Sequence, residues 1–199
     1  MIRLYHREGT GRPVRVAWTL EELDVPYEVT RMDREEGKSD DHRRRHPLGR
    51  VPVLEDGGQL LYESGAICMQ LADTHPEAGL LPPIGTAERG MAYQWVCFAP
   101  AEIEPPLFEA WMYAEHDPER SAKARKRFDA AAGAVHDRLD GAEYLVGDRF
   151  GVADIMVATT LLFTVRPGFF DELSPRLKEY VGRLRERPAF GRAAKRALL

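Results

Sequence analysis

Cysteine is scarce in this chain of 199 residues, where only Cys68 and Cys97 occur. The two form no Cys-x-x-Cys pair, no zinc-ligand spacing and no disulfide framework, a usage typical of a reducing compartment. We therefore expect a cytoplasmic protein without a metal site. Each cysteine lies in an apolar stretch, which predicts that both thiols pack as small hydrophobic side chains.

Long hydrophobic runs and an excess of one charge are also absent. No apolar run approaches the ~18 residues that span a bilayer, and the N-terminus lacks the apolar region of a signal peptide. The net charge is only −4, which gives no reason to expect binding to nucleic acid. We expect no membrane partner either. With 44% hydrophobic and 30% charged residues, the composition is that of one large or two modest globular domains.

The first residues alternate between strand and helix signals. A short apolar strand at Ile2–Tyr5 precedes a helix predicted from Arg12 to Leu23, with Pro13 in the first turn, where no backbone donor is needed. Tyr27–Met32 alternates and is rich in β-forming residues, which predicts a second strand. A charged stretch, 33–50, reads as a polar loop.

A hairpin and a helix complete this half. Asp56-Gly57-Gly58 is a turn signal between strands predicted at Val51–Glu55 and Gln59–Tyr62. Ser64 is a suitable N-cap for a helix at Gly65–Thr74. The order βαβ followed by ββα predicts the mixed sheet of a thioredoxin-like domain over 1–76.

Proline and glycine mark a linker over 77–85, and the segment beyond it, 86–199, reads as an all-helical domain. Pro100 and the pair Pro105-Pro106 should kink or interrupt the first of its helices. The helices are expected at 86–115, 118–139, 152–165, 175–185 and 188–197.

Thr10 is the first residue that could carry chemistry. It lies between two glycines, after the first strand and at the start of the first helix. A helix N-terminus offers unpaired N–H groups and a positive dipole end that stabilise a thiolate or another anion. Thr10 could donate a hydrogen bond to a thiolate there, or it could simply cap the helix.

Glu63 and Ser64 place a carboxylate and a hydroxyl at a strand-to-helix junction. Glu63 could bind an ammonium group, while Ser64 and the first helical N–H groups could bind a carboxylate, as the α-amino acid end of a γ-glutamyl group requires. A plain cap preceded by a surface glutamate is the alternative. Asp154, at the third position of a later helix, reads as a structural group that bonds back to the cap backbone.

Taken in order, these features resemble the glutathione transferase superfamily over essentially the whole chain. The resemblance rests on four groups of residues: Tyr5 with Arg15-Val16-Ala17-Trp18 and Leu20-Glu21-Glu22-Leu23; Pro47-Leu48-Gly49-Arg50-Val51-Pro52-Val53-Leu54; Glu63-Ser64-Gly65-Ala66-Ile67; and Ala153-Asp154-Ile155. It implies a thioredoxin-like domain that binds glutathione as cosubstrate, followed by a helical domain. It also implies that the proline matching Pro52 is cis, although X–Pro bonds in folded proteins are cis only about 5–6% of the time.

The resemblance also assigns the ligand's parts. Val51, beside Pro52, would pair its backbone with the cysteinyl unit of glutathione, and Glu63 and Ser64 would hold the γ-glutamyl end. A basic or polar residue of the loop would meet the glycyl carboxylate; the candidates are Lys38, His42 and Arg50. The thiol-activating group is Thr10, with Tyr5 and Arg12 as the alternatives, since a guanidinium at a helix start could also stabilise a thiolate.

The reaction implied is attack of the glutathione thiolate on a small hydrophobic electrophile, as in detoxification. Aromatic residues beyond the linker, Trp95, Phe98 and Trp111, could line the electrophile site between the domains, although aromatic pairs at this spacing are also typical of a core. The resemblance further implies a homodimer. The alternatives are a non-catalytic interaction protein on the same fold, or an isomerase, a dehalogenase or a transferase of another thiol.

Overall fold

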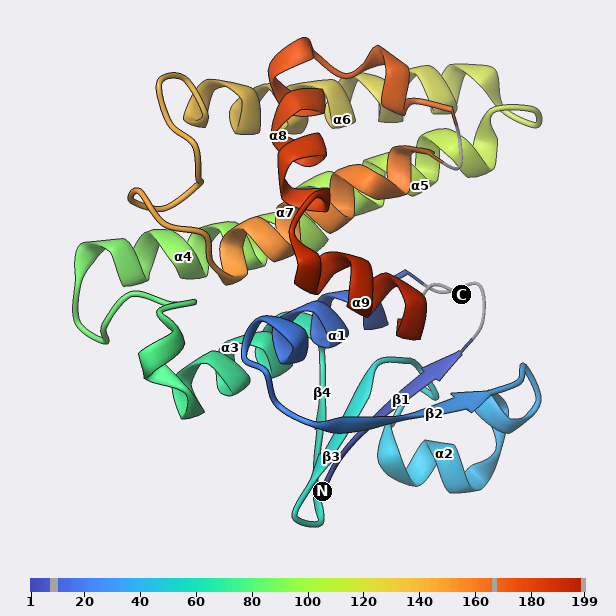
Figure 1. Ribbon diagram of the computed structural model, residues 1–199. Coiled ribbons are helices and arrows are strands. Elements are labelled where there is room, and N and C mark those ends of the chain that lie inside the picture. The colour runs from blue at the N-terminus through green and yellow to red at the C-terminus, as the bar shows by residue number, and fades with distance from the viewer. Residues whose placement is uncertain (8–10, 166–167, 198–199) are drawn as a thin grey trace. The chain divides into compact units, whose positions relative to one another are not determined.

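The computed structural model describes residues 1–7, 11–165 and 168–197, and Figure 1 shows the order of their elements. By its internal contacts the chain divides into two compact units. One comprises Met1–Leu81 together with Arg185–Leu199, and the other comprises Pro82–Leu184. Each unit has its own buried apolar core.

A four-stranded mixed sheet forms the centre of the first unit. Its strands are β1 (Ile2–Arg7), β2 (Tyr27–Met32), β3 (Val53–Asp56) and β4 (Gln59–Tyr62), in the order β2-β1-β3-β4. β1 runs parallel to β2 and antiparallel to β3, and β3 and β4 form the hairpin. The predicted thioredoxin-like sheet is confirmed. β2 and β4 have the predicted bounds, whereas β3 begins two residues later than expected.

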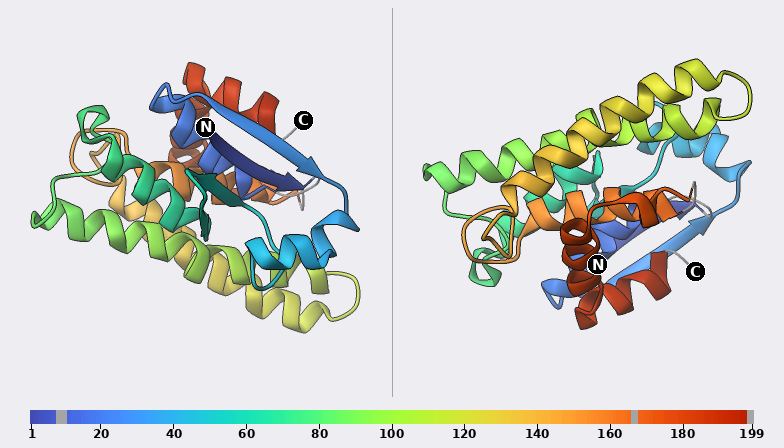
Figure 2. Two further views of the ribbon diagram at one scale, coloured as in Figure 1. Left: turned by 90° about the horizontal axis from the view of Figure 1, so that it is seen from below. Right: turned by 90° about the horizontal axis from the view of Figure 1, so that it is seen from above.

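Helices cover both faces of this sheet, as Figures 1 and 2 show. α1 (Pro13–Glu22) and α3 (Ser64–Thr74) pack on each other, and the fully buried Leu4 and Leu54 pair with each other across β1 and β3. Side chains alternate along a strand, so Tyr5 faces the other way. Its ring lies under the Arg45 guanidinium, 4.8 Å from the ring centroid, and α2 therefore covers that face.

The segment expected to be a loop, 33–50, contains the short helix α2 (Asp40–Arg45). The Ser39 hydroxyl caps it by accepting a hydrogen bond from the His42 N–H at 3.2 Å. His42 is fully buried, and together with Arg45 over the Tyr5 ring it attaches this charged helix to the unit. The prediction of an uninterrupted loop was wrong because such a helix shows no apolar repeat.

The C-terminal helix α9 (Pro188–Ala197) packs on α1. The Phe190 ring meets the Trp18 ring edge-on at 4.8 Å. Arg187 binds the Glu22 carboxylate through two hydrogen bonds, of 2.6 and 2.8 Å. The sequence boundaries assigned this helix to the second domain, but the acidic end of α1 holds it within the contacts of the first unit.

The described part of the second unit is helical. Its helices are α4 (Ala87–Phe98), α5 (Glu104–Tyr113), α6 (Pro118–Arg138), α7 (Val152–Leu162) and α8 (Pro175–Arg185). Pro100 lies in a π-helical turn, Ala99–Ile103, that interrupts the first helix as predicted. Pro105 and Pro106 lie in the first turn of α5, where proline is tolerated.

α7 forms the core of this unit and is buried from Val152 to Leu161. The Asp154 carboxylate fixes its start by accepting hydrogen bonds from the Gly151 N–H and the Leu145 N–H, both at 3.0 Å, and from the Tyr180 hydroxyl at 2.8 Å. The predicted bond from Asp154 back to the cap backbone is confirmed. Burial raises the pKa of Asp154 to about 6, against the lowering effect of these donors.

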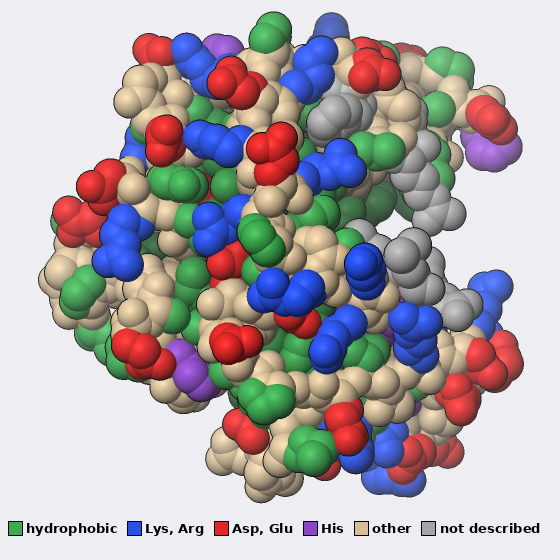
Figure 3. All heavy atoms as spheres, viewed as in Figure 1, with side chains coloured by type: hydrophobic (Ala, Val, Ile, Leu, Met, Phe, Trp, Pro, Cys, Tyr) green, Lys and Arg blue, Asp and Glu red, His purple; other side chains and the backbone are tan. Residues whose placement is uncertain are grey.

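The surface mixes both signs of charge. Figure 3 shows Lys and Arg side chains interspersed with Asp and Glu over one face. None of the described helices is long and apolar enough to cross a membrane.

Candidate active site

The peptide bond between Val51 and Pro52 is cis, as the family resemblance implied. It lies just before β3, and Pro52 is buried while Val51 is half-buried. Val51 packs against the small apolar cluster of Tyr5, Met32 and Val53. The main chain at this point is therefore held by the sheet on one side.

His42 in α2 also holds this stretch. Its Nε2 lies 2.9 Å from the carbonyl oxygen of Arg50. A carbonyl only accepts hydrogen bonds, so the His42 Nε2–H donates this one. The sequence suggested His42 as a ligand for the glycyl carboxylate. The structure contradicts that role, since the imidazole is fully buried and this nitrogen binds backbone.

Glu63 joins β4 to α3 in an unusual backbone conformation. Its φ is +68° and its ψ is +109°, a region that side chains with a Cβ rarely adopt and that costs about 1–3 kcal/mol. Glu63 is the N-cap residue and its side chain is exposed. The prediction that Ser64 caps the helix was wrong: Ser64 is the first helical residue, and Glu63 turns the chain into it.

Ser64 is buried and is in contact with a buried arginine. Arg15, inside α1, is fully buried and donates from Nη1 to the Ser64 Oγ at 3.2 Å. The sequence analysis did not predict a role for Arg15 in the site, since the residue appeared there only within a motif. Its position within an otherwise apolar stretch of α1, between Val14 and Val16, was the available signal.

His46 links the loop to this junction. Its ring lies 4.8 Å from the Tyr62 ring, and its Nδ1 accepts a hydrogen bond from the Leu48 N–H at 3.0 Å. Burial lowers the pKa of His46, the Glu63 carboxylate raises it, and Arg50 lowers it further. Glu63 and Arg50 thus both act on the His46 imidazole, so one acidic and one basic group lie near the same ring.

The three candidates for thiol activation are Thr10, Arg12 and Tyr5, and the structure describes the last two. Thr10 lies outside the described residues. Arg12 is exposed at the N-cap of α1. Tyr5 is buried, and its hydroxyl donates to the Glu55 Oε2 at 2.6 Å. That proton is already bonded to a carboxylate, which disfavours Tyr5 as a donor to a ligand thiolate.

The two basic candidates for the glycyl carboxylate are both exposed. Lys38 forms an ion pair with Glu35 at 2.9 Å, so a ligand would have to compete with that carboxylate. Arg50 follows Gly49 and precedes the cis peptide, and its charge acts on His46 beside Glu63. Arg50 is the better placed of the two.

The aromatic candidates lie in the second unit and divide by exposure. Trp95 is buried and meets the half-buried Phe98 edge-on at 5.2 Å, which is the packing of a core. Trp111 is 37% exposed. It lines a surface cavity of about 320 Å³ with Met112, Ala114, Glu115 and His116.

The cysteines also divide. Cys68 is fully buried as predicted, and burial raises the pKa of its thiol to about 11, so it is not a reactive thiolate. Cys97 is exposed on α4, and the prediction that it packs as a hydrophobic residue was wrong. Its neighbours Trp95 and Val96 take the buried face of the helix instead.

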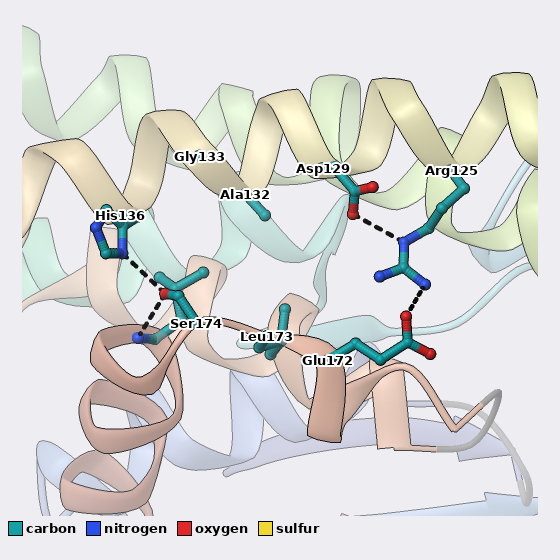
Figure 4. Close-up of a pocket in the computed structure, with 9 residues that line it drawn as sticks. Arg125, Asp129, Ala132, Gly133, His136, Glu172, Leu173 and Ser174 are labelled. Carbon is teal, nitrogen blue, oxygen red and sulfur yellow. Dashed lines mark hydrogen bonds and ion pairs between the residues drawn. The ribbon is translucent and has the colours of Figure 1, made fainter.

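A second cavity, of about 280 Å³, lies between α6 and the segment before α8 (Figure 4). Arg125 stands at one end and bonds both Asp129 and Glu172 at 2.8 Å. His136 stands at the other end, where its Nδ1 lies 2.8 Å from the Ser174 Oγ. Its polar groups are thus bonded to one another. Among the described residues, no group of His, Cys, Asp and Glu could hold a metal ion.

These features define a class of protein: a thioredoxin-like unit with a cis-proline and a Glu-Ser junction, joined to a helical unit. Family models for the glutathione S-transferase N-terminal and C-terminal domains match residues 1–73 and 100–183. Glutathione S-transferase GstB of Escherichia coli (strain K12) is 31% identical over 199 residues, covering 95% of this chain and 95% of the relative. The chain belongs to the glutathione S-transferase family.

Solved structures agree with this assignment. A glutathione transferase from Methylococcus capsulatus is 31% identical with a TM-score of 0.87, and 98% of each chain is covered. A glutathione transferase homologue from Lodderomyces elongisporus, solved with two glutathione molecules per subunit, is 28% identical with a TM-score of 0.88. That match covers 98% of this chain and 97% of the homologue.

Proposed function

We propose that this protein is a glutathione transferase, which binds glutathione in its first unit and directs the thiolate at a small hydrophobic electrophile. The observation that carries the proposal is the junction of Glu63 and Ser64, where an exposed carboxylate adjoins a buried hydroxyl backed by Arg15. An ammonium and a carboxylate on one carbon, as in a γ-glutamyl group, match this pair of opposite sites.

The rest of the tripeptide follows from this anchor. Val51, next to Pro52, would pair its backbone with the cysteinyl unit. Arg50, whose charge acts close to Glu63, would bind the glycyl carboxylate, with Lys38 as the alternative. This arrangement suits a ligand with two carboxylates and one ammonium group, which are the charged groups of glutathione at neutral pH.

The thiol would lie at the start of α1, where the positive end of the helix dipole favours a thiolate. We assign its activation to Thr10, with Arg12 as the alternative, and not to Tyr5. The electrophile would use the aromatic surface around Trp111, while Trp95 and Phe98 pack against each other in α4. A cytoplasmic homodimer with a role in detoxification is part of the same proposal.

Replacing Thr10 with alanine should separate turnover from binding. We expect kcat with an activated aryl chloride to fall about 10- to 100-fold, because a hydrogen bond to a developing or bound thiolate is worth about 1.5–3 kcal/mol. The Kd for glutathione should change less than about threefold, since the γ-glutamyl and glycyl contacts remain. The absorbance of bound thiolate near 240 nm, titrated with pH, should show a higher thiol pKa in the variant.

Serine is the matched control at position 10, because it keeps the hydroxyl. Unchanged kcat and unchanged thiol pKa in Thr10→Ala would remove Thr10 from the assignment, and Arg12→Gln would then be the variant expected to lose turnover. A wild-type protein that binds glutathione without turning over any electrophile would support the non-catalytic alternative.

A further inference from the structure

Arg15 is a buried cation at the back of the proposed γ-glutamyl site. The residue is 0% exposed and lies in the third position of α1. Its Nη1 donates to the Ser64 Oγ at 3.2 Å, and Ser64 itself is 5% exposed. Burying a guanidinium is costly, so one that donates to the hydroxyl of the proposed site calls for a function.

The direction of this hydrogen bond determines what Ser64 can do. A guanidinium has five donors and no acceptor, while a hydroxyl has one donor and two acceptor positions. Ser64 therefore accepts from Arg15, and its own O–H remains to donate. Within residues 1–7, 11–165 and 168–197, no acceptor receives that proton from Ser64. The hydroxyl is thus preset as a donor.

We propose that Arg15 is a positioning residue that makes Ser64 selective for the α-carboxylate of the γ-glutamyl group. Because Arg15 is fully buried, it acts through Ser64 and does not touch the ligand. It fixes the hydroxyl as a donor, and by donating to the Ser64 oxygen in a region of low dielectric it strengthens the hydroxyl's own O–H as a donor. This inference rests on the proposed binding of glutathione.

A double-mutant cycle tests the coupling, with glutathione Kd measured by calorimetry. Ser64→Ala and Arg15→Met should each weaken binding about tenfold, the usual effect of losing a hydrogen bond to a charged group. The double variant should stay near tenfold to twentyfold, because Arg15 has nothing left to position once the hydroxyl is gone. If the double variant bound glutathione about a hundredfold more weakly, the product of the two single effects, the inference would be overturned. An Arg15→Met variant that binds like wild type would overturn it as well.

A ligand analogue gives a readout that a purely structural arginine would not move. Glutathione with its γ-glutamyl α-carboxylate converted to an amide should bind the wild type more weakly. Its Kd should be nearly the same in wild type and Arg15→Met, since the preset donor and the buried charge serve the carboxylate. An equal loss of affinity for glutathione and for the amide would show that Arg15 only supports the fold.

Controls separate the failures. Arg89, 4% exposed in α4 of the other unit, bonds the Pro82 carbonyl at 2.9 Å; Arg89→Met should cost stability and leave the glutathione Kd unchanged. Should Arg15→Met not fold, Arg15→Lys carries the same cycle, with a smaller loss that must vanish in the Ser64→Ala background. A wild type that binds no glutathione would refute the proposed function itself, whereas normal binding with independent effects refutes only the role of Arg15.

Discussion

Replacing Glu63 with glycine should stabilise the fold and weaken glutathione binding in the same variant. The residue holds φ at +68° and ψ at +109°, a conformation that costs about 1–3 kcal/mol with a Cβ present and little for glycine. The greater freedom of glycine in the unfolded chain offsets about 0.5–1 kcal/mol of this gain. We therefore expect the free energy of unfolding to rise by about 1 kcal/mol.

Binding should change in the opposite direction. Without the carboxylate, the ammonium of the γ-glutamyl group loses its partner, at a cost of about 1–3 kcal/mol, or roughly 5- to 150-fold in Kd. Strain kept at one residue of a site is best explained when the side chain it presents is needed there. The wild-type protein is thus expected to have a lower free energy of unfolding than Glu63→Gly and a higher affinity for glutathione.

Alanine at position 63 is the matched control, because it removes the carboxylate and keeps the Cβ. Glu63→Ala should lose the same affinity as Glu63→Gly without the gain in stability. Chemical denaturation and calorimetry on the three proteins measure both quantities. If Glu63→Gly bound glutathione as tightly as wild type, the conformation at position 63 would have no connection with the ligand.

The second large effect is expected at Asp154, in the other unit. Asp154→Ala should lower the free energy of unfolding at pH 5 by about 3 kcal/mol or more. Three donors, the N–H groups of Leu145 and Gly151 and the hydroxyl of Tyr180, would lose their partner, and each stranded buried donor costs about 1–3 kcal/mol. Tyr180→Phe, which removes one donor together with its own need for a partner, should cost only about 1 kcal/mol.

The pH dependence gives Asp154 a second signature. Burial raises its pKa in the folded state to about 6, from 3.8, so folding favours the neutral carboxyl. The resulting stability is fully present below about pH 4 and is lost as the pH rises through 6, with an amplitude of about 3 kcal/mol. Asp154→Asn should lack this component between pH 4 and 7. A wild type whose stability rises over that interval relative to Asp154→Asn would contradict the assigned direction.

The sequence predicted those parts of the fold that local signals specify. The turn Asp56-Gly57-Gly58 defines the β3–β4 hairpin and gave β4 its observed bounds, and the third-position Asp154 indicated the start of α7. α2 was missed because its residues, from Asp40 to Arg45, are charged throughout except for His42, so no apolar period marks a helix. A serine cap, one buried imidazole and the Arg45 contact with the Tyr5 ring hold it in place.

The sequence pointed to residues of the candidate site, but not to the buried groups that hydrogen-bond to them. Glu63 and Ser64 could be identified by their charge and hydroxyl at a strand-to-helix junction, but the positive φ of Glu63 is a consequence of how β4 and α3 meet. Arg15 carries one sign of burial, its place between Val14 and Val16, whereas His42 lies in a charged run that carries none. Only tertiary packing turns them inward, behind Ser64 and behind the Arg50 carbonyl.

Calorimetric titration of the wild-type protein with reduced glutathione, beside S-hexylglutathione and glutathione disulfide, tests the central claim most directly. The account predicts saturable binding of glutathione in the micromolar to low-millimolar range, tighter binding of the S-hexyl conjugate through an apolar second pocket, and loss of affinity in Ser64→Ala. No heat and no competition by any of the three ligands at accessible concentrations would contradict it, and would leave the fold serving another thiol or a protein partner.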